Sequence, residues 1–71
     1  GEEAAARLEL LDRERAAWQA RVQAYQNERA RISTQHREAA ARQQALDAYL
    51  ANHFDEAEQR RIRSLEAIGE L

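Results

Sequence analysis

The 71-residue sequence has no cysteine, no proline and no methionine, and it contains only two glycines. Without cysteine, neither a disulfide nor a thiolate-bound metal can stabilise so short a chain. No run of about 18 apolar residues is present, so no segment is predicted to span a bilayer. The length fits one small domain, residues 1–71. The acidic start at Gly1-Glu2-Glu3 is not a signal peptide, so we expect the chain to be a fragment whose targeting segments lie elsewhere.

Lysine is also missing, so all eleven basic residues are arginine, against thirteen acidic residues. The formal net charge of −2 argues against a bulk attraction to nucleic acid or to an anionic membrane. The one basic cluster, Arg60-Arg61-Ile62-Arg63, lies within one helical turn of Glu56, Glu58 and Glu66. We expect these carboxylates to neutralise it on a solvated helix face. No nucleic-acid partner and no membrane contact by this segment are predicted.

The composition is dominated by strong helix formers, and proline, the strongest helix breaker, is absent. From Glu2 to Ile32, apolar residues recur at spacings of three and four, which mark one face of a helix. The apolar positions of this face are Ala4, Leu8, Leu11, Trp18, Val22, Tyr25 and Ile32. Arg15 and Arg29 occupy the two remaining positions of the same face. The pattern predicts one helix over residues 2–32, about 45 Å long at about 1.5 Å per residue.

Two shorter helices are predicted after it. Ser33 and Thr34 are good N-caps, so a second helix is expected over residues 35–51. Asn52 can adopt the left-handed conformation that ends helices. Asp55 and Glu58 have the spacing of a capping box, which begins a third helix over residues 55–69, with Gly69 as its stop. The fold class is therefore an all-α arrangement of three helices.

The expected core is Trp18, Val22, Tyr25, Ile32, Leu46, Leu50, Phe54, Ile62, Leu65 and Ile68. Two helices of roughly 24 Å each cannot cover the whole first helix. If they pack near Trp18–Ile32, the leucines at the other end, among them Leu8 and Leu11, form an apolar patch for a partner. The alternative is that these first turns fray.

Arg15 and Arg29 admit two interpretations, and so do the aromatic residues between them. The arginine stems can pack while their guanidinium groups reach water, or the guanidinium groups can bind carboxylates or carbonyls across a partner contact. Trp18 and Tyr25 are expected in the core, with a role as interface anchors as the alternative. The candidate partner-binding residues are thus Leu8, Leu11, Arg15 and Arg29.

No catalytic or metal-binding pattern is present. His36 and His53 lack metal-ligand spacing, and Ser33 and Ser64 have no nucleophile context. No glycine-rich phosphate loop occurs. The chain is therefore predicted to be no enzyme and to carry no cofactor and no metal.

An ordered set of residues across the chain resembles the C-terminal part of lipase-specific foldases, the steric chaperones of secreted bacterial lipases. In the first helix, the resemblance rests on Leu11-Asp12-Arg13, Arg15, Trp18, Arg21-Val22, Tyr25, Glu28-Arg29 and Arg31-Ile32. It resumes at Phe54, Glu58-Gln59, Arg61 and Leu65-Glu66. Relatives carry a glycine-containing loop and a Leu-Ser cap between the first two helices, where this chain has Ile32-Ser33-Thr34-Gln35-His36-Arg37.

The resemblance implies that residues 1–71 are the second helical mini-domain of a larger, multi-helical and non-enzymatic chaperone, whose two mini-domains together clasp a lipase. It also implies a periplasmic location and a parent protein anchored in the bacterial inner membrane. The family's activating motif, of the Arg-x-x-Phe-Asp-Tyr type, is absent, so this segment is expected to bind the lipase rather than activate it. The alternative is a structural helical-bundle or coiled-coil module that oligomerises through the Leu8–Ile32 face. A long dimer of this kind would bury four unpaired arginine charges.

Overall fold

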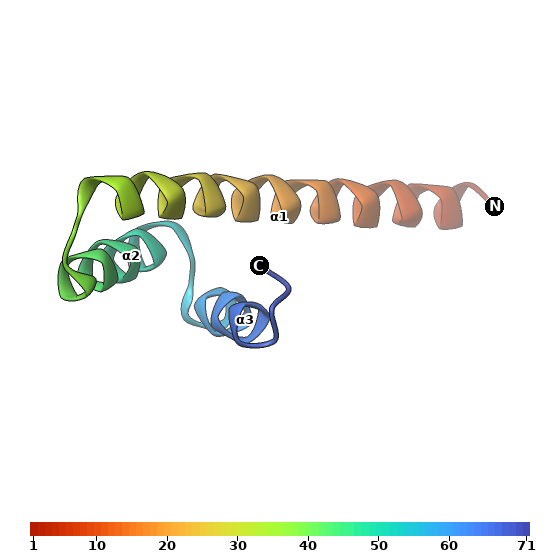
Figure 1. The fold of residues 1–71 in the computed structure, drawn as a ribbon. Helices are drawn as coiled ribbons and strands as arrows, with labels where there is room; N and C mark the ends of the chain where they lie inside the picture. The colour runs from red at the N-terminus through yellow and green to blue at the C-terminus, as the bar shows by residue number, and fades with distance from the viewer.

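The computed structural model describes all 71 residues, and it consists of three α-helices. Helix α1 (Glu2–Gln35) runs the full length of the molecule, which measures 55 × 23 × 19 Å. Helix α2 (Ala39–His53) turns back alongside the C-terminal half of α1, and α3 (Glu56–Ala67) lies on the same side of α1 (Figure 1). The prediction of an all-α fold with one long and two shorter helices is confirmed.

Helix α1 continues through Ser33 and Thr34, so the predicted break at these residues is wrong. The Ser33 hydroxyl donates to the carbonyl of Arg29 at 3.0 Å, and the Thr34 hydroxyl donates to the carbonyl of Arg31 at 2.8 Å. Such backward bonds satisfy the hydroxyl groups inside the helix, where they do not act as caps. The helix therefore ends at Gln35, three residues later than predicted.

The connection between α1 and α2 is held by Arg42, from the first turns of α2. Its guanidinium donates to the carbonyl of His36 at 3.1 Å and to that of Arg37 at 2.6 Å. The second helix begins at Ala39 rather than at residue 35, and its N-cap, Glu38, makes no side-chain capping bond. The chain reverses here without a glycine, because an arginine side chain binds the carbonyl groups of the turn.

The boundary between α2 and α3 lies at Phe54 and Asp55. Asn52 is helical and no residue other than glycine has a positive φ, so the left-handed stop predicted at Asn52 is wrong. The capping box is confirmed: Asp55 Oδ1 accepts from the Glu58 amide at 2.8 Å, and Glu58 Oε1 accepts from the Asp55 amide at 3.0 Å. The first orphan amides of α3 are thus paired by its own side chains.

The end of α3 depends on Gly69, which has a φ of 78°. The Gly69 amide donates to the backbone carbonyl of Glu66 at 3.1 Å, and the Glu70 amide donates to the backbone carbonyl of Leu65 at 2.9 Å. This pair of bonds is a Schellman motif, and it needs a left-handed residue that glycine supplies at little cost. The stop predicted at Gly69 is confirmed.

The core lies where the C-terminal half of α1 meets the joint between α2 and α3. The buried residues are Val22, Tyr25, Ile32, Leu50, Phe54 and Ile62. Around Phe54, aromatic rings meet edge to face, with Trp18 at 5.9 Å and Tyr25 at 6.5 Å between ring centroids. Phe54 thus packs against two aromatic residues of α1. These contacts fix the position of the two shorter helices along α1.

The other four predicted core residues are less buried. Trp18, Leu46 and Leu65 are half-buried. Ile68 is 71% exposed, so its assignment to the core is wrong. Each step of three residues falls about 60° short of a full turn, so two steps carry Ile68 about 120° away from Ile62. Ile62 has no exposed surface, and Ile68 consequently faces water.

Candidate partner-binding surface

The N-terminal half of α1 extends beyond the two shorter helices and is covered by neither of them (Figure 1). No residue before Trp18 is buried or half-buried. Leu8 is 63% exposed, Leu10 55% and Leu11 54%. Such exposure of three leucines within four residues is unfavourable in water, because full burial of a leucine side chain contributes roughly 1.5–3 kcal/mol. We name Leu8, Leu10 and Leu11 the leucine patch.

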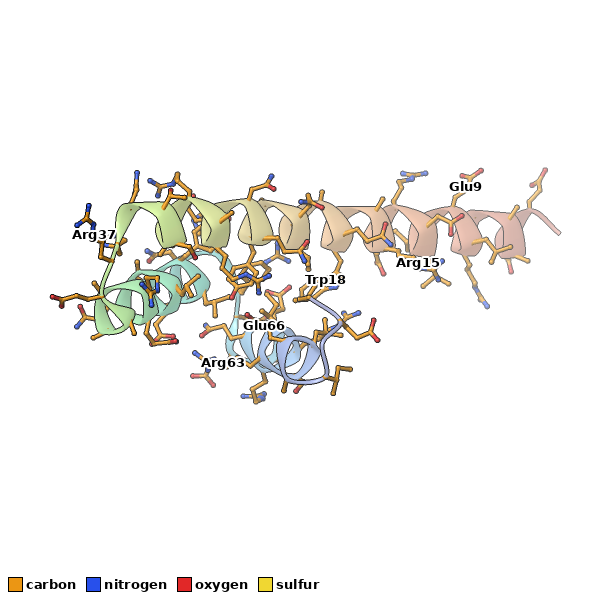
Figure 2. The ribbon with its side chains drawn as sticks, in the orientation of Figure 1. Glu9, Arg15, Trp18, Arg37, Arg63 and Glu66 are labelled. Atoms are coloured by element: carbon orange, nitrogen blue, oxygen red, sulfur yellow. The ribbon has the colours of Figure 1, made fainter.

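The leucine patch is bordered by charged residues that leave it accessible. Glu9 and Arg13 form an exposed ion pair at 3.6 Å, and Figure 2 shows Glu9 on the side of α1 turned away from α3. By helical spacing, Leu8 and Leu11 continue the face that carries Trp18. The apolar face of α1 thus continues from the leucine patch, past Arg15, into the core, and only its second part is covered by another helix.

Arg15 lies between the leucine patch and the core. Figure 2 shows it on the same side of α1 as Trp18, one turn closer to the N-terminus. Its side chain is exposed and forms no ion pair. Of the two arginines predicted on this face, Arg15 is the one whose guanidinium faces water.

Arg29 is used within the chain. Its guanidinium donates to Glu66 Oε2 at 2.7 Å, and the Tyr25 hydroxyl donates to Glu66 Oε1 at 2.9 Å. Burial, together with the bond to Glu66, raises the pKa of Tyr25 to about 12. Arg29 therefore joins α1 to α3 and lies fourteen residues away from Arg15, roughly 21 Å along the helix. The structure does not bring Arg29 together with Leu8 and Leu11.

Arg21 is the residue that the sequence prediction missed. It donates to Glu58 Oε2 at 2.6 Å and Oε1 at 3.1 Å, and to the carbonyl of His53 at 2.7 Å. Its guanidinium also lies 4.6 Å from the Phe54 ring centroid. The bonds from Arg21 and from the Asp55 amide lower the pKa of Glu58 to about 2. Arg21 thus connects α1 with both the end of α2 and the start of α3.

These pairs correct the interpretation of the basic cluster in α3. Glu58 and Glu66 pair with arginines of α1, so these two carboxylates do not neutralise the arginines of α3. Within the cluster, Arg63 approaches Asp47 of α2 at 3.8 Å. Arg61 lies 4.3 Å from the centroid of Trp18. The cluster is therefore distributed over several contacts and does not form one neutralised face.

Neither histidine approaches a metal-like ligand set. His53 stacks on Tyr49 with 4.1 Å between ring centroids, and the His36 carbonyl accepts from Arg42. No group of three or more histidine, cysteine, aspartate or glutamate side chains could hold a metal ion.

Comparison with known proteins finds a family whose sequence model matches this chain. The sequence model described as proteobacterial lipase chaperone protein matches residues 1–59, which include α1, α2 and the start of α3. The chain is 43% identical over 71 residues to lipase chaperones of Stutzerimonas stutzeri and Ectopseudomonas mendocina, across 99% of this chain and 21% of each relative. The chain therefore spans about a fifth of the length of these curated relatives. No solved structure matches it.

Proposed function

Because the chain belongs to the family of proteobacterial lipase chaperones, we propose that it is a non-enzymatic module that binds a secreted bacterial lipase. The bound lipase is a folding client, and the module contributes to its folding by holding it. The contact is made by the uncovered part of α1. The observation that carries this proposal is the leucine patch, whose apolar side chains have no partner within the chain.

The leucine patch suits a protein partner because it combines apolar area with a charged border. Leu8 and Leu11 share one face of α1, and Arg15 lies one turn beyond them on the same face. An arginine beside an apolar surface can bind a carboxylate of the partner in a bidentate manner while its stem packs. These side chains already share one helix before a partner binds, so less backbone entropy has to be lost on binding.

Binding without activation is the role we assign to this segment. His53-Phe54-Asp55-Glu56 shares only Phe-Asp with the activating motif that the resemblance implies, and Phe54 is 5% exposed. A side chain buried at the joint of three helices is not available to a partner.

The relationship to proteobacterial lipase chaperones also supports a periplasmic location for a parent protein anchored in the inner membrane. No helix of this chain is long and apolar enough to cross a membrane.

The experiment compares the chain with a Leu8→Asp/Leu11→Asp variant in binding to the cognate lipase, measured by calorimetry. The double variant should bind at least tenfold more weakly, a loss of about 1.4 kcal/mol or more. Its thermal melting should stay close to that of the unsubstituted chain, because neither leucine is buried.

The matched control is Ala16→Asp/Ala20→Asp, which adds the same two charges to the same helix. Both alanines are exposed, and at 3.6 residues per turn they lie on the side of α1 opposite the middle of the leucine patch. This control should bind the lipase as the unsubstituted chain does. Unchanged binding by a folded Leu8→Asp/Leu11→Asp variant would remove the leucine patch from the interface. A stable self-dimer that does not bind lipase would favour an oligomerisation module instead.

A further inference from the structure

Two neighbouring hollows lie on the side of α1 that faces α3. The larger one has a volume of about 500 Å³ and the smaller about 250 Å³. Arg15, Trp18 and Arg61 line both, so the two hollows form one continuous depression, which we name the α1–α3 groove. It begins beside Leu11 and extends along α1 past Val22. The groove therefore adjoins the leucine patch at one end and the core at the other.

The groove offers apolar surface among polar side chains. Four of the ten residues that line its larger hollow are apolar: Trp18, Val22, Leu65 and Leu71. Trp18, Leu65 and Leu71 are half-buried, and Val22 is 8% exposed. Part of each half-buried side chain thus remains in contact with water. An apolar side chain entering the groove would cover this surface and gain roughly 25 cal/mol for each Å² of apolar area removed from water.

The charges of the groove are concentrated where its two hollows meet. The arginines that form no ion pair are Arg7, Arg15, Arg37, Arg42, Arg60 and Arg61. Only Arg15 and Arg61 among them line the groove, and both belong to both hollows. Arg61 is held 4.3 Å from the Trp18 ring centroid, an arrangement that orients its guanidinium without using its charge.

Two carboxylates also border the groove, but at separate hollows. Glu14 lines only the smaller hollow and Glu70 only the larger one, and neither approaches Arg15 or Arg61 within ion-pair distance. The junction beside Trp18 consequently holds two guanidinium groups of like charge. A carboxylate placed there would relieve their repulsion and accept charge-assisted hydrogen bonds.

We propose that the α1–α3 groove binds a segment of the protein partner in which an aspartate or glutamate lies within one helical turn of a large apolar residue. The carboxylate binds Arg15 and Arg61 at the junction, and the apolar side chain packs on Trp18 and Val22. The identity of the partner as a lipase rests on the function proposed above, whereas the chemistry of the groove does not. Arg15 and Arg61 are thus specificity-determining residues of the interface.

A direct test uses a capped Leu-Ala-Asp-Ala-Leu peptide and the chain labelled with fluorotryptophan at Trp18, its only tryptophan. Fluorine NMR should show a saturable shift with this peptide. At least a fivefold weaker response is expected from the Asp→Asn peptide and from inorganic phosphate, because each lacks one of the two required features. Equal responses to the aspartate and asparagine peptides, or no response, would overturn the proposal.

A second test measures lipase binding by Arg15→Gln and Arg61→Gln, with Arg60→Gln as the matched control. Arg60 is exposed, lies beside Arg61 on α3 and does not line the groove. Each groove variant should weaken binding about tenfold and reduce its salt dependence, and Arg15→Lys should recover only part of the loss because its ammonium is not a planar fork. The Arg60 variant should bind normally.

The two proposals fail in different ways. If Leu8→Asp/Leu11→Asp weakens lipase binding while both groove variants bind normally, the groove proposal is wrong and the proposed function stands. If the unsubstituted chain binds no lipase, the proposed function is wrong, and the peptide titration alone then decides the chemistry of the groove. Circular dichroism melting of every variant separates lost binding from lost folding.

Discussion

Replacement of Ile62 by alanine should destabilise the chain strongly, whereas the same replacement at Ile68 should not. Ile62 lies in α3 and Ile68 is the C-cap residue of the same helix, six positions later. Ile62 is 0% exposed and belongs to the cluster of Tyr25, Leu50 and Phe54, while Ile68 is 71% exposed. The pair therefore compares a buried and a solvated isoleucine within a single small fold.

The size of the expected effect follows from the burial of Ile62. Ile→Ala removes three carbon atoms, and at about 0.8 kcal/mol for each buried methylene the transfer term is about 2.4 kcal/mol. The cavity left between three helices adds to this, and the better helix propensity of alanine returns about 0.4 kcal/mol. We expect the free energy of unfolding to fall by about 2–4 kcal/mol for Ile62→Ala, and by less than about 0.5 kcal/mol for Ile68→Ala.

The measurement is urea denaturation followed by circular dichroism and by Trp18 fluorescence. In a domain of this length, each kcal/mol corresponds to about 4–8 °C in melting temperature, so Ile62→Ala should melt at least about 8 °C lower. Loss of most of the helical circular dichroism signal of Ile62→Ala before any urea is added would also agree with the reasoning. Similar denaturation midpoints for the two variants would refute it, because Ile62 would then not be the residue that anchors α3.

Three further outcomes test the joint between the helices. Asp55→Ala should lower the free energy of unfolding by about 0.5–2 kcal/mol through loss of the capping box, as measured by thermal melting. Because Arg21 lowers the pKa of Glu58 from its ordinary 4.5 to about 2, this group stabilises the fold above pH 4.5 and loses that effect as the pH falls towards 2. Glu58→Gln should therefore flatten the acid limb of a plot of stability against pH, and an unchanged limb would contradict the pairing. Tyr25 has its pKa raised from 10 to about 12, so stability should decline as the pH rises from 10 towards 12, and Tyr25→Phe should abolish that part of the decline in alkaline melting curves.

The fold class was accessible from the sequence because it depends on features that are close together along the chain. The spacing of apolar residues from Leu8 to Ile32 predicts the long helix without knowledge of its neighbours. The Asp55–Glu58 capping box and the Gly69 stop each use atoms within five residues of one another. Length also predicted that part of the long helix stays uncovered, since two short helices cannot cover it. That the uncovered part carries Leu8 and Leu11 depended on where the short helices pack.

Local signals were wrong where a residue had two local options of similar energy. Ser33 and Thr34 could cap a new helix or bond back into the existing one, and no glycine or proline favoured the first option. Asn52 could end a helix in the left-handed region or continue it, and it continues. Ile68 fitted the three-residue spacing of the apolar residues in α3. Two such steps, however, rotate it about 120° around the helix axis, away from the buried side of Ile62.

The tertiary structure alone decided which charges meet and which stay free. Arg21 and Glu58 are 37 residues apart, as are Arg29 and Glu66, and Tyr25 and Glu66 are 41 apart. No periodicity of the sequence encodes such pairings, because each depends on the angle at which α3 crosses α1. The same angle places Arg61 over Trp18 and leaves Arg15 unpaired beside it, so the α1–α3 groove exists only once the three helices have packed.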